Sequence, residues 1–184
     1  MNKNENKKKS MLELHRITCD EFKNVKKIPL VVVLDDVRSL NNIGSVFRTA
    51  DAFVVEKIYL CGITATPPHP DIHKTALGAE ESVAWEYCDD VMKCVEKLKA
   101  DGYEVCSIEQ VHNSISLDQF KVEEKEKYAV VLGNEVKGVK QSVVDASDYC
   151  IELPQYGTKH SLNVSITAGI VMWDFFKAFA CKGK

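Results

Sequence analysis

The stretch Leu153-Pro154-Gln155-Tyr156-Gly157-Thr158-Lys159-His160-Ser161-Leu162-Asn163-Val164-Ser165 joins the last two elements that the sequence predicts. An apolar run over 149–153 predicts a strand that stops at Pro154, because proline cannot donate to a sheet ladder. A polar loop follows, and Ser161 is expected to open the last long apolar helix as its N-cap. This order of elements either makes a simple connection or presents backbone groups to a ligand.

The overall composition indicates a single domain with a large core, since 45% of the 184 residues are hydrophobic. No run of about 18 apolar residues exists, so we expect no membrane span. Residues 1–9 lack the apolar segment of a secretory signal. Seven cysteines without a Cys-x-x-Cys pair are typical of reduced thiols, which indicates a cytoplasmic protein.

Charge is distributed unevenly along the chain. Residues 1–27 hold eight basic and four acidic residues, a balance of +4, so the remainder carries −7 of the total of −3. Such a basic arm suits a polyanion, because each phosphate contact releases counterions, although the charge by itself favours a solvated, partly disordered tail. We expect a basic arm with a short helix over 1–28 and one domain over 29–184.

The hydrophobic pattern alternates between two periods. Apolar runs predict strands over 30–34, 56–60, 82–87, 103–108 and 128–132, with Pro29 ending the N-terminal segment. Helical spacing predicts helices over 11–22, 43–54, 89–100 and from the 138 region to about 146. The pattern over 116–120 does not distinguish strand from turn. Strands that alternate with helices indicate an α/β fold with a mostly parallel sheet flanked by helices.

Polar side chains stand at the start of the helix over 43–54. Asn41 or Asn42 is the expected N-cap. Arg48 lies off the apolar face, where it either pairs with Asp51 on the surface or faces a ligand. In open α/β sheets, ligands bind at the carboxyl ends of the strands, which would place Asn42 at the rim of the site.

The segment Gly133-Asn134-Glu135-Val136-Lys137-Gly138 follows the buried run over 128–132. Its glycines resemble those of a phosphate loop, but Val139 and Lys140 occupy the places where a P-loop has Lys and Ser or Thr. Nucleotide hydrolysis is therefore not expected, and a glycine turn with an exposed acid, Glu135, remains. His69 and His73 lie four residues apart without close thiolate pairs, so we expect no metal site.

Three segments in this order resemble the signature motifs of the SpoU (TrmH) family in the SPOUT superfamily of RNA methyltransferases. They are 34–50, 131–138 and 153–165, and 74–81 is similar to the family's usual intervening segment. The resemblance covers about residues 30–180. One departure is Val136-Lys137, where many relatives have a small residue after the glutamate.

The resemblance implies a SPOUT fold with a C-terminal trefoil knot, in which the last helix is threaded through a loop. It also implies a homodimer, with S-adenosylmethionine as cofactor and a ribose 2′-hydroxyl of RNA as methyl acceptor. The sulfonium is already activated, so no metal is required. The apolar surface of the last helix serves either core and interface together or core alone; it comprises Leu162, Ile166, Ile170, Trp173 and Phe176.

The resemblance also implies the site residues. The cofactor candidates are Leu132, Gly133, Asn134, Gly138, Ile151, Leu153, Pro154, Ser161 and Leu162. The catalytic candidates are Asn42, Arg48, Glu135, Ser161 and Asn163. The family often assigns Arg48 as general base, but a guanidinium stays protonated in proteins. Stabilising a developing alkoxide or clamping a phosphate fits a permanent cation better.

The expected substrate is tRNA rather than rRNA, because the chain lacks the extra N-terminal RNA-binding domain of some relatives. A non-catalytic RNA-binding protein that retained the fold is the main alternative. It predicts damage among the five catalytic candidates, all of which are intact. A small-molecule methyltransferase with the same fold also remains open.

Overall fold

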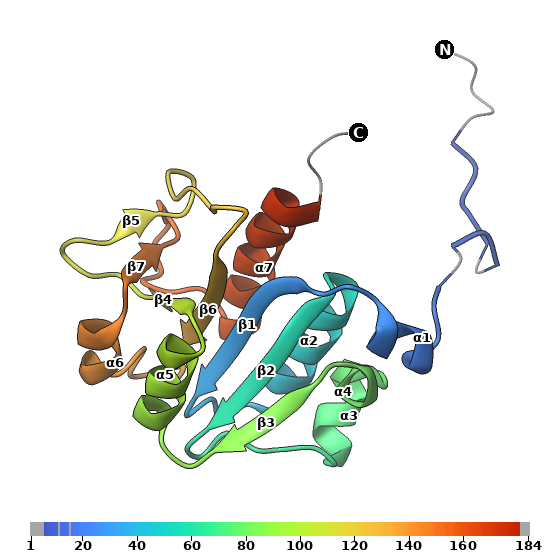
Figure 1. The fold of residues 1–184 in the computed structure, drawn as a ribbon, viewed down its shortest axis with the longest axis horizontal. Coiled ribbons are helices and arrows are strands. Elements are labelled where there is room, and N and C mark those ends of the chain that lie inside the picture. Colours follow the sequence, from blue (N-terminus) through green and yellow to red (C-terminus); the bar gives the residue numbers. More distant parts are fainter. Residues whose placement is uncertain (1–5, 11, 15, 181–184) are drawn as a thin grey trace.

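The computed structural model describes residues 6–10, 12–14 and 16–180 of the chain. Helices and strands alternate along most of this length (Figure 1). The elements are the 3-10 helix η1 (Leu12–Leu14), α1 (Cys19–Asn24), β1 (Ile28–Asp35), α2 (Leu40–Ala52), β2 (Val55–Cys61), α3 (Pro70–Ala76), α4 (Ala79–Ser82), β3 (Trp85–Cys88), α5 (Val91–Ala100), β4 (Tyr103–Ile108), β5 (Ile115–Ser116), β6 (Lys127–Leu132), α6 (Gln141–Ala146), β7 (Tyr149–Glu152) and α7 (Val164–Ala180).

One sheet of seven strands forms the middle layer, in the order β3-β2-β1-β6-β4-β7-β5. Every neighbouring pair in it is parallel. Figure 1 shows α5 and α6 in front of the sheet, with α2 and α7 behind it. The predicted α/β fold with a parallel sheet and flanking helices is therefore confirmed. The threading of α7 that would make a trefoil knot stays a prediction.

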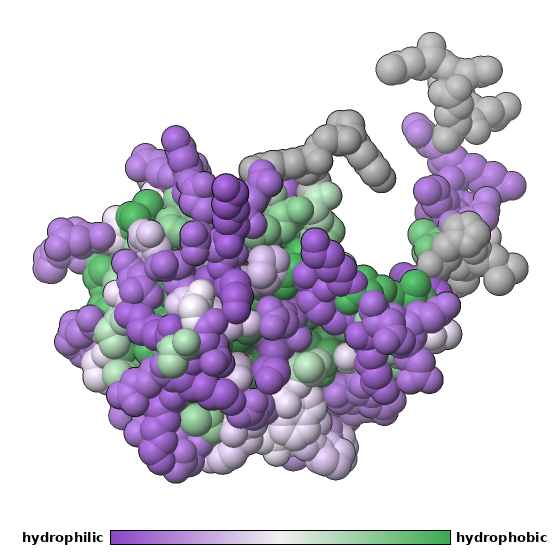
Figure 2. All heavy atoms as spheres, in the orientation of Figure 1, coloured by the Kyte–Doolittle hydropathy of each residue, from purple (hydrophilic) through white to green (hydrophobic). Residues whose placement is uncertain are grey.

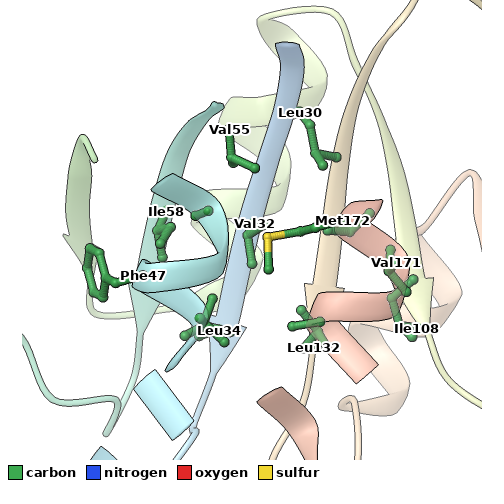
Figure 3. Close-up of a cluster of buried hydrophobic side chains, with 14 of the residues drawn as sticks. Leu30, Val32, Leu34, Phe47, Val55, Ile58, Ile108, Leu132, Val171 and Met172 are labelled. Atoms are coloured by element: carbon green, nitrogen blue, oxygen red, sulfur yellow. The ribbon is translucent and has the colours of Figure 1, made fainter. Parts of the chain in front are cut away.

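The central strands are buried on both faces, which explains their continuous apolar sequence. Leu30, Val32 and Leu34 of β1 pack in one core cluster with residues of α2 and α7 (Figure 3). Val31 and Val33 belong to a second cluster with residues of α5 and α6. Alternate side chains of one strand thus enter two cores, as the period of two requires. The outer face in view in Figure 2 is mainly hydrophilic.

The carboxyl ends of the parallel strands meet at one edge of the sheet. β1 pairs with β2 on one side and with β6 on the other, and β6 is followed along the sheet by β4 and β7. The direction of the strand order therefore changes between β1 and β6, and open α/β sheets bind ligands near such a point. The segments after β1, β4, β6 and β7 are brought together there.

The start of α2 differs from the prediction. The helix begins at Leu40, and its N-cap is Ser39, whose hydroxyl accepts a hydrogen bond from the Asn42 N–H at 3.3 Å. An N-cap residue needs a non-helical backbone, and Ser39 has φ −78° and ψ 112°. Asn41 and Asn42 already lie in the first turn, so the prediction of either as N-cap is wrong. This leaves the Asn42 side chain free for other contacts.

The start of α7 is also later than predicted. The helix begins at Val164, and Ser161 lies in the exposed segment before it, so the prediction that Ser161 opens the helix is wrong. Asn163 serves as the cap instead, because its Oδ1 accepts from the Ser165 N–H at 2.9 Å and its carbonyl from the Thr167 N–H at 2.9 Å. Asparagine is as good a cap as serine.

The N-terminal part holds less helix than predicted over 11–22. The described residues of this part contain only η1 and α1, and Met11 lies outside them. Thr18 and Glu21 form a reciprocal capping box that starts α1. Phe22 of α1 is buried in the same core as β1, so this helix packs on the domain. The boundary at residue 28 stays a prediction.

Two strand starts also differ from the prediction. β1 starts at Ile28, and Pro29 lies inside it, where the pairing with β2 shifts register between Ile28 and Val31. β3 starts at Trp85, because Ser82 ends α4. The segment over 116–120, whose type the sequence left open, begins with the last residue of β5 and continues as a turn. No helix of the described residues is long and apolar enough to cross a membrane.

Candidate functional site

Most candidate residues surround one cleft of about 700 Å³ at the carboxyl ends of β4, β6 and β7. Its lining includes eight of the nine cofactor candidates, namely Leu132, Gly133, Asn134, Gly138, Ile151, Leu153, Ser161 and Leu162. The ninth, Pro154, is exposed outside the lining. A hollow of about 790 Å³ beside α6 is larger, but no candidate residue lines it. We therefore take the smaller cleft as the candidate site.

The loop after β6 forms one wall of this cleft and closes on itself. Backbone hydrogen bonds join Asn134 and Gly138 in both directions, at 3.1 and 2.9 Å. A Cβ atom at Gly133 would overlap the backbone of Gly138 and Val139. Only glycine allows this close approach of two backbone segments, which explains a glycine directly after the strand.

The Asn134 side chain fixes the shape of the loop and its place against β1. Its Oδ1 accepts from the Val136 and Lys137 N–H groups at 2.9 and 3.1 Å. Its Nδ2 donates to the carbonyl oxygen of Asp36 at 2.8 Å. Asparagine side chains commonly form such local turns. The residue therefore holds the loop from within and ties it to the end of β1.

Glu135 reaches from the same loop to the start of α2. Its carboxylate accepts from the N–H groups of Arg38 and Ser39, both at 3.1 Å, and from Asn42 Nδ2 at 3.3 Å. Burial by itself raises the pKa of Glu135, but the hydrogen bonds outweigh it and hold the pKa below its ordinary value. The carboxylate stays ionised and supplies negative charge near the N-terminus of α2.

Asn163 extends this network to α7. Its Oδ1 accepts from the Ser165 N–H, so its amide nitrogen is free to donate, and Nδ2 lies 3.1 Å from Asn42 Oδ1. Asn42 in turn donates to Glu135. The order of donors and acceptors therefore runs one way, from the cap of α7 through Asn42 to the loop after β6. Three of the five catalytic candidates thus lie in one hydrogen-bonded row.

Arg48 lies on α2, about a turn and a half beyond Asn42, and is exposed. Within the described part of the chain it makes no hydrogen bond or ion pair. Asp51 instead accepts from the Ser82 hydroxyl at 2.6 Å, so the expected surface pair between Arg48 and Asp51 is absent among these residues. The guanidinium remains available to a ligand outside the chain.

The segment over 154–162 forms another wall of the cleft and is held very differently. Among the described residues, its one hydrogen bond to the rest of the chain joins Gln110 Nε2 to the His160 carbonyl oxygen at 3.3 Å. Tyr156 is 98% exposed, and Ser161 and Leu162 are exposed as well. The backbone groups of this segment are therefore open to a ligand.

Two further residues contribute to the site and were not predicted from the sequence. Glu109, directly after β4, lines the cleft and accepts from the Val139 N–H at 2.9 Å. Lys140 reaches the carboxylates of Asp35 and Asp36. Both act across more than 25 residues of sequence, and the only sequence signal was a charged residue beside a predicted strand end or loop.

The two histidines that lie four residues apart have other partners. His69 Nδ1 accepts from the Asp71 N–H at 3.1 Å and caps α3. His73 Nδ1 lies 2.5 Å from Glu80 Oε1. Within the described residues, no group of three or more His, Cys, Asp or Glu is placed to hold a metal ion.

Comparison with known proteins places this chain in a family. The sequence model of the SpoU rRNA Methylase family matches residues 29–173. A 23S rRNA (guanosine-2'-O-)-methyltransferase, RlmB, from Neisseria meningitidis is 28% identical over 153 residues, which are 83% of this chain and 61% of that protein. The chain spans less than two thirds of the length of the curated relatives that it matches, between 58% and 64%.

Solved structures share the fold. The TrmH/SpoU tRNA modifying enzyme of A. aeolicus has a TM-score of 0.76 at 24% identity, over 87% of this chain and 81% of that one. An AdoMet-bound rRNA methyltransferase from Sinorhizobium meliloti has a TM-score of 0.76 at 22% identity, over 84% and 59%. The family match covers most of the chain, including the strands, loops and helices that form the cleft. The chain belongs to the SpoU rRNA Methylase family.

Proposed function

We propose that this chain is an RNA methyltransferase that uses S-adenosylmethionine to methylate a ribose 2′-hydroxyl. The observation that carries the proposal is the row from Asn163 through Asn42 to Glu135. It joins the starts of α7 and α2 to the loop after β6, beside a cleft of about 700 Å³. The name of the Neisseria relative, a 23S rRNA (guanosine-2'-O-)-methyltransferase, supports the proposal.

The cleft fits S-adenosylmethionine in size and in chemistry. Leu132, Ile151 and Leu153 supply apolar lining, while the absence of a side chain at Gly133 lets a ligand approach the backbone. The cofactor would be held by these residues and by Asn134, Gly138, Pro154, Ser161 and Leu162. Bound there, it supplies an activated methyl group on a sulfonium, so no metal is needed.

The chain's own residues would orient the acceptor and stabilise charge. Arg48 is exposed and free of protein partners within the described residues, and its fork of donors suits a developing alkoxide or the adjacent phosphate. The lowered pKa of Glu135 makes it a poor proton acceptor near neutral pH, and its carboxylate already accepts three hydrogen bonds. We therefore assign Glu135, Asn42 and Asn163 to positioning.

The remaining features of the proposal concern partners. We propose tRNA ahead of rRNA as the substrate, supported by the name of the A. aeolicus relative, which this chain resembles over most of both lengths. The basic arm over 1–28 would help to hold the RNA. A homodimer is supported by apolar side chains exposed along α7, namely Ile166, Ile170 and Trp173. Free thiols at all six described cysteines suit the cytoplasm.

The test measures transfer of tritium from labelled S-adenosylmethionine to bulk tRNA and, separately, to bulk rRNA from cells lacking the gene. Label recovered in alkali-resistant dinucleotides would identify ribose 2′-O-methylation and the RNA class. Arg48→Ala protein is the control and should incorporate the label at a rate about 10³-fold lower. Cofactor binding without transfer to either RNA would contradict the proposal and favour a non-catalytic RNA-binding protein.

A further inference from the structure

Lys140 forms an ion-pair cluster with two carboxylates that no part of the proposed reaction uses. Its Nζ lies 2.9 Å from Asp35 Oδ1 and 2.8 Å from Asp36 Oδ2. The Asp35 side chain is 1% exposed, that of Asp36 27% and that of Lys140 46%. One lysine thus neutralises a buried carboxylate at the end of β1 together with its more exposed neighbour.

The position of Lys140 in the chain gives this cluster its significance. It ends the loop over 133–140 and directly precedes α6. The start of the same loop is tied to β1 by the hydrogen bond from Asn134 to the Asp36 carbonyl oxygen at 2.8 Å. The two ends of the loop therefore bind the same two-residue segment. Between them, Glu135 holds the residues that follow this segment, Arg38 and Ser39.

Burial of the Asp35 carboxylate strengthens its ion pair with Lys140. Burial raises the pKa of Asp35, and the hydrogen bond from Lys140 opposes this rise. Removing one partner of a buried pair costs far more than losing an exposed pair, because it leaves a buried charge unpaired. Without Lys140, the carboxylates of Asp35 and Asp36 would also repel each other beside the loop.

We propose that Lys140 is a positioning residue for the cofactor, which acts by fastening the loop over 133–140 to the buried end of β1. The inference rests on the proposed function for the identity of the cofactor. Lys140 is not required to touch the cofactor, since the loop residues Gly133, Asn134 and Gly138 line the cleft themselves. Its effect is on cofactor affinity rather than on the transfer of the methyl group.

The experiment titrates S-adenosylmethionine into the full chain by calorimetry and compares wild type with Lys140→Met, Lys140→Arg and Lys99→Met. Lys140→Met should raise the Kd about tenfold, and Lys140→Arg should stay within about threefold. Lys99→Met is the matched control, because Lys99 pairs with Asp148 at 2.8 Å at the far end of α6. It should leave the Kd unchanged. At saturating cofactor, kcat of Lys140→Met should stay within about threefold of wild type.

A second arm measures the mechanism without the cofactor. Amide hydrogen exchange at Gly138 and Val139 should be faster in Lys140→Met and unchanged in Lys99→Met. In Lys140→Met combined with Asp35→Asn, the loss of affinity should be smaller than the product of the two single losses. Asp36→Asn keeps the buried pair of Lys140 and Asp35 and should raise the Kd only slightly. This variant still tests the inference if Lys140→Met does not fold.

The outcomes separate this inference from the proposed function. Wild-type Kd together with wild-type exchange in Lys140→Met would overturn the role of Lys140. Equal losses of cofactor affinity in Lys140→Met and Lys99→Met would also overturn it, because an ion pair at either end of α6 would then have the same effect. Failure of the wild-type protein to bind S-adenosylmethionine would contradict the proposed function. The amide hydrogen exchange measurement would still decide whether Lys140 holds the loop over 133–140.

Discussion

Two segments line the same cleft and differ in how they are held. The loop over 133–140 is fastened to β1, to the start of α2 and to Glu109 after β4. The segment over 154–162 has one hydrogen bond to the rest of the described chain, at His160. The first wall of the cleft is therefore held by contacts to several other elements, whereas the second has few such contacts.

The difference indicates how the two walls would contribute to binding. A loop already held in place costs little entropy when a ligand binds, so its contacts appear fully in the affinity. A segment with few contacts to the rest of the protein loses more conformational freedom when a ligand binds, which lowers the affinity. Changes in the held wall should accordingly have larger effects than changes in the loose one.

The largest effect is expected at Arg48, on the helix that Glu135 ties to the held loop. Arg48→Ala should lower kcat by about 10³-fold, because a charged donor to a developing oxyanion is removed. Cofactor affinity, measured by calorimetry, should stay at the wild-type value. Arg48→Lys should also fail, since one ammonium cannot replace the guanidinium fork. Near-normal turnover in Arg48→Ala would show that α2, which Glu135 holds against the loop over 133–140, does not act on the methyl acceptor.

The next largest effect is expected at Gly133. Gly133→Ala places a Cβ in the backbone of Gly138 and Val139 and must push the loop open. The opened loop would lose contacts with the cofactor, so the Kd for S-adenosylmethionine should rise by about 100-fold, or about 2.8 kcal/mol of binding free energy. Calorimetry measures it, with circular dichroism to establish that the protein is folded. Unchanged affinity would mean that the cofactor does not use this wall.

A smaller and pH-dependent effect is expected at Glu135. Its folded pKa lies below the ordinary 4.5, so the carboxylate stabilises the fold above that pH, and this contribution is lost as the pH falls through the folded pKa. Glu135→Gln should lower Tm by about 2–4 °C near neutral pH, and the difference should shrink as the pH falls below 4.5 toward the folded pKa. Differential scanning calorimetry over a series of pH values measures it. A difference in Tm that persists in acid would show that the effect comes from the shape of the Glu135 side chain rather than from its charge.

The smallest effect is expected in the loose segment. Gly157→Ala meets no atom within 4 Å, so it is the matched counterpart of Gly133→Ala. Its Kd and kcat should stay within about twofold of wild type, as is typical of surface changes. The same two assays apply to both glycine variants. A loss as large as that at Gly133 would show that the segment over 154–162 is ordered more tightly than its contacts indicate, and the comparison would fail.

Local pattern determined much of this protein. The continuous apolar runs at β1 and β6 identified buried parallel strands because both faces of each strand need hydrophobic side chains. Gly133 after β6 and Pro154 after β7 predicted the loops of the cleft. Glycine lets the backbone approach other groups closely, whereas proline cannot donate a hydrogen bond to a sheet. The order of these segments also identified the family, whose model matches residues 29–173.

Helix starts and side-chain partners were decided only by the tertiary structure. Ser39, Asn41 and Asn42 are all plausible caps by residue type, and the choice follows from Glu135, which lies more than 90 residues away in sequence and holds both Ser39 and Asn42. The partners of Lys140 could not be predicted either, because Asp35 and Asp36 lie more than 100 residues earlier. Periodicity reports which face of an element is buried, whereas contacts between loops depend on how the strands are ordered in the sheet.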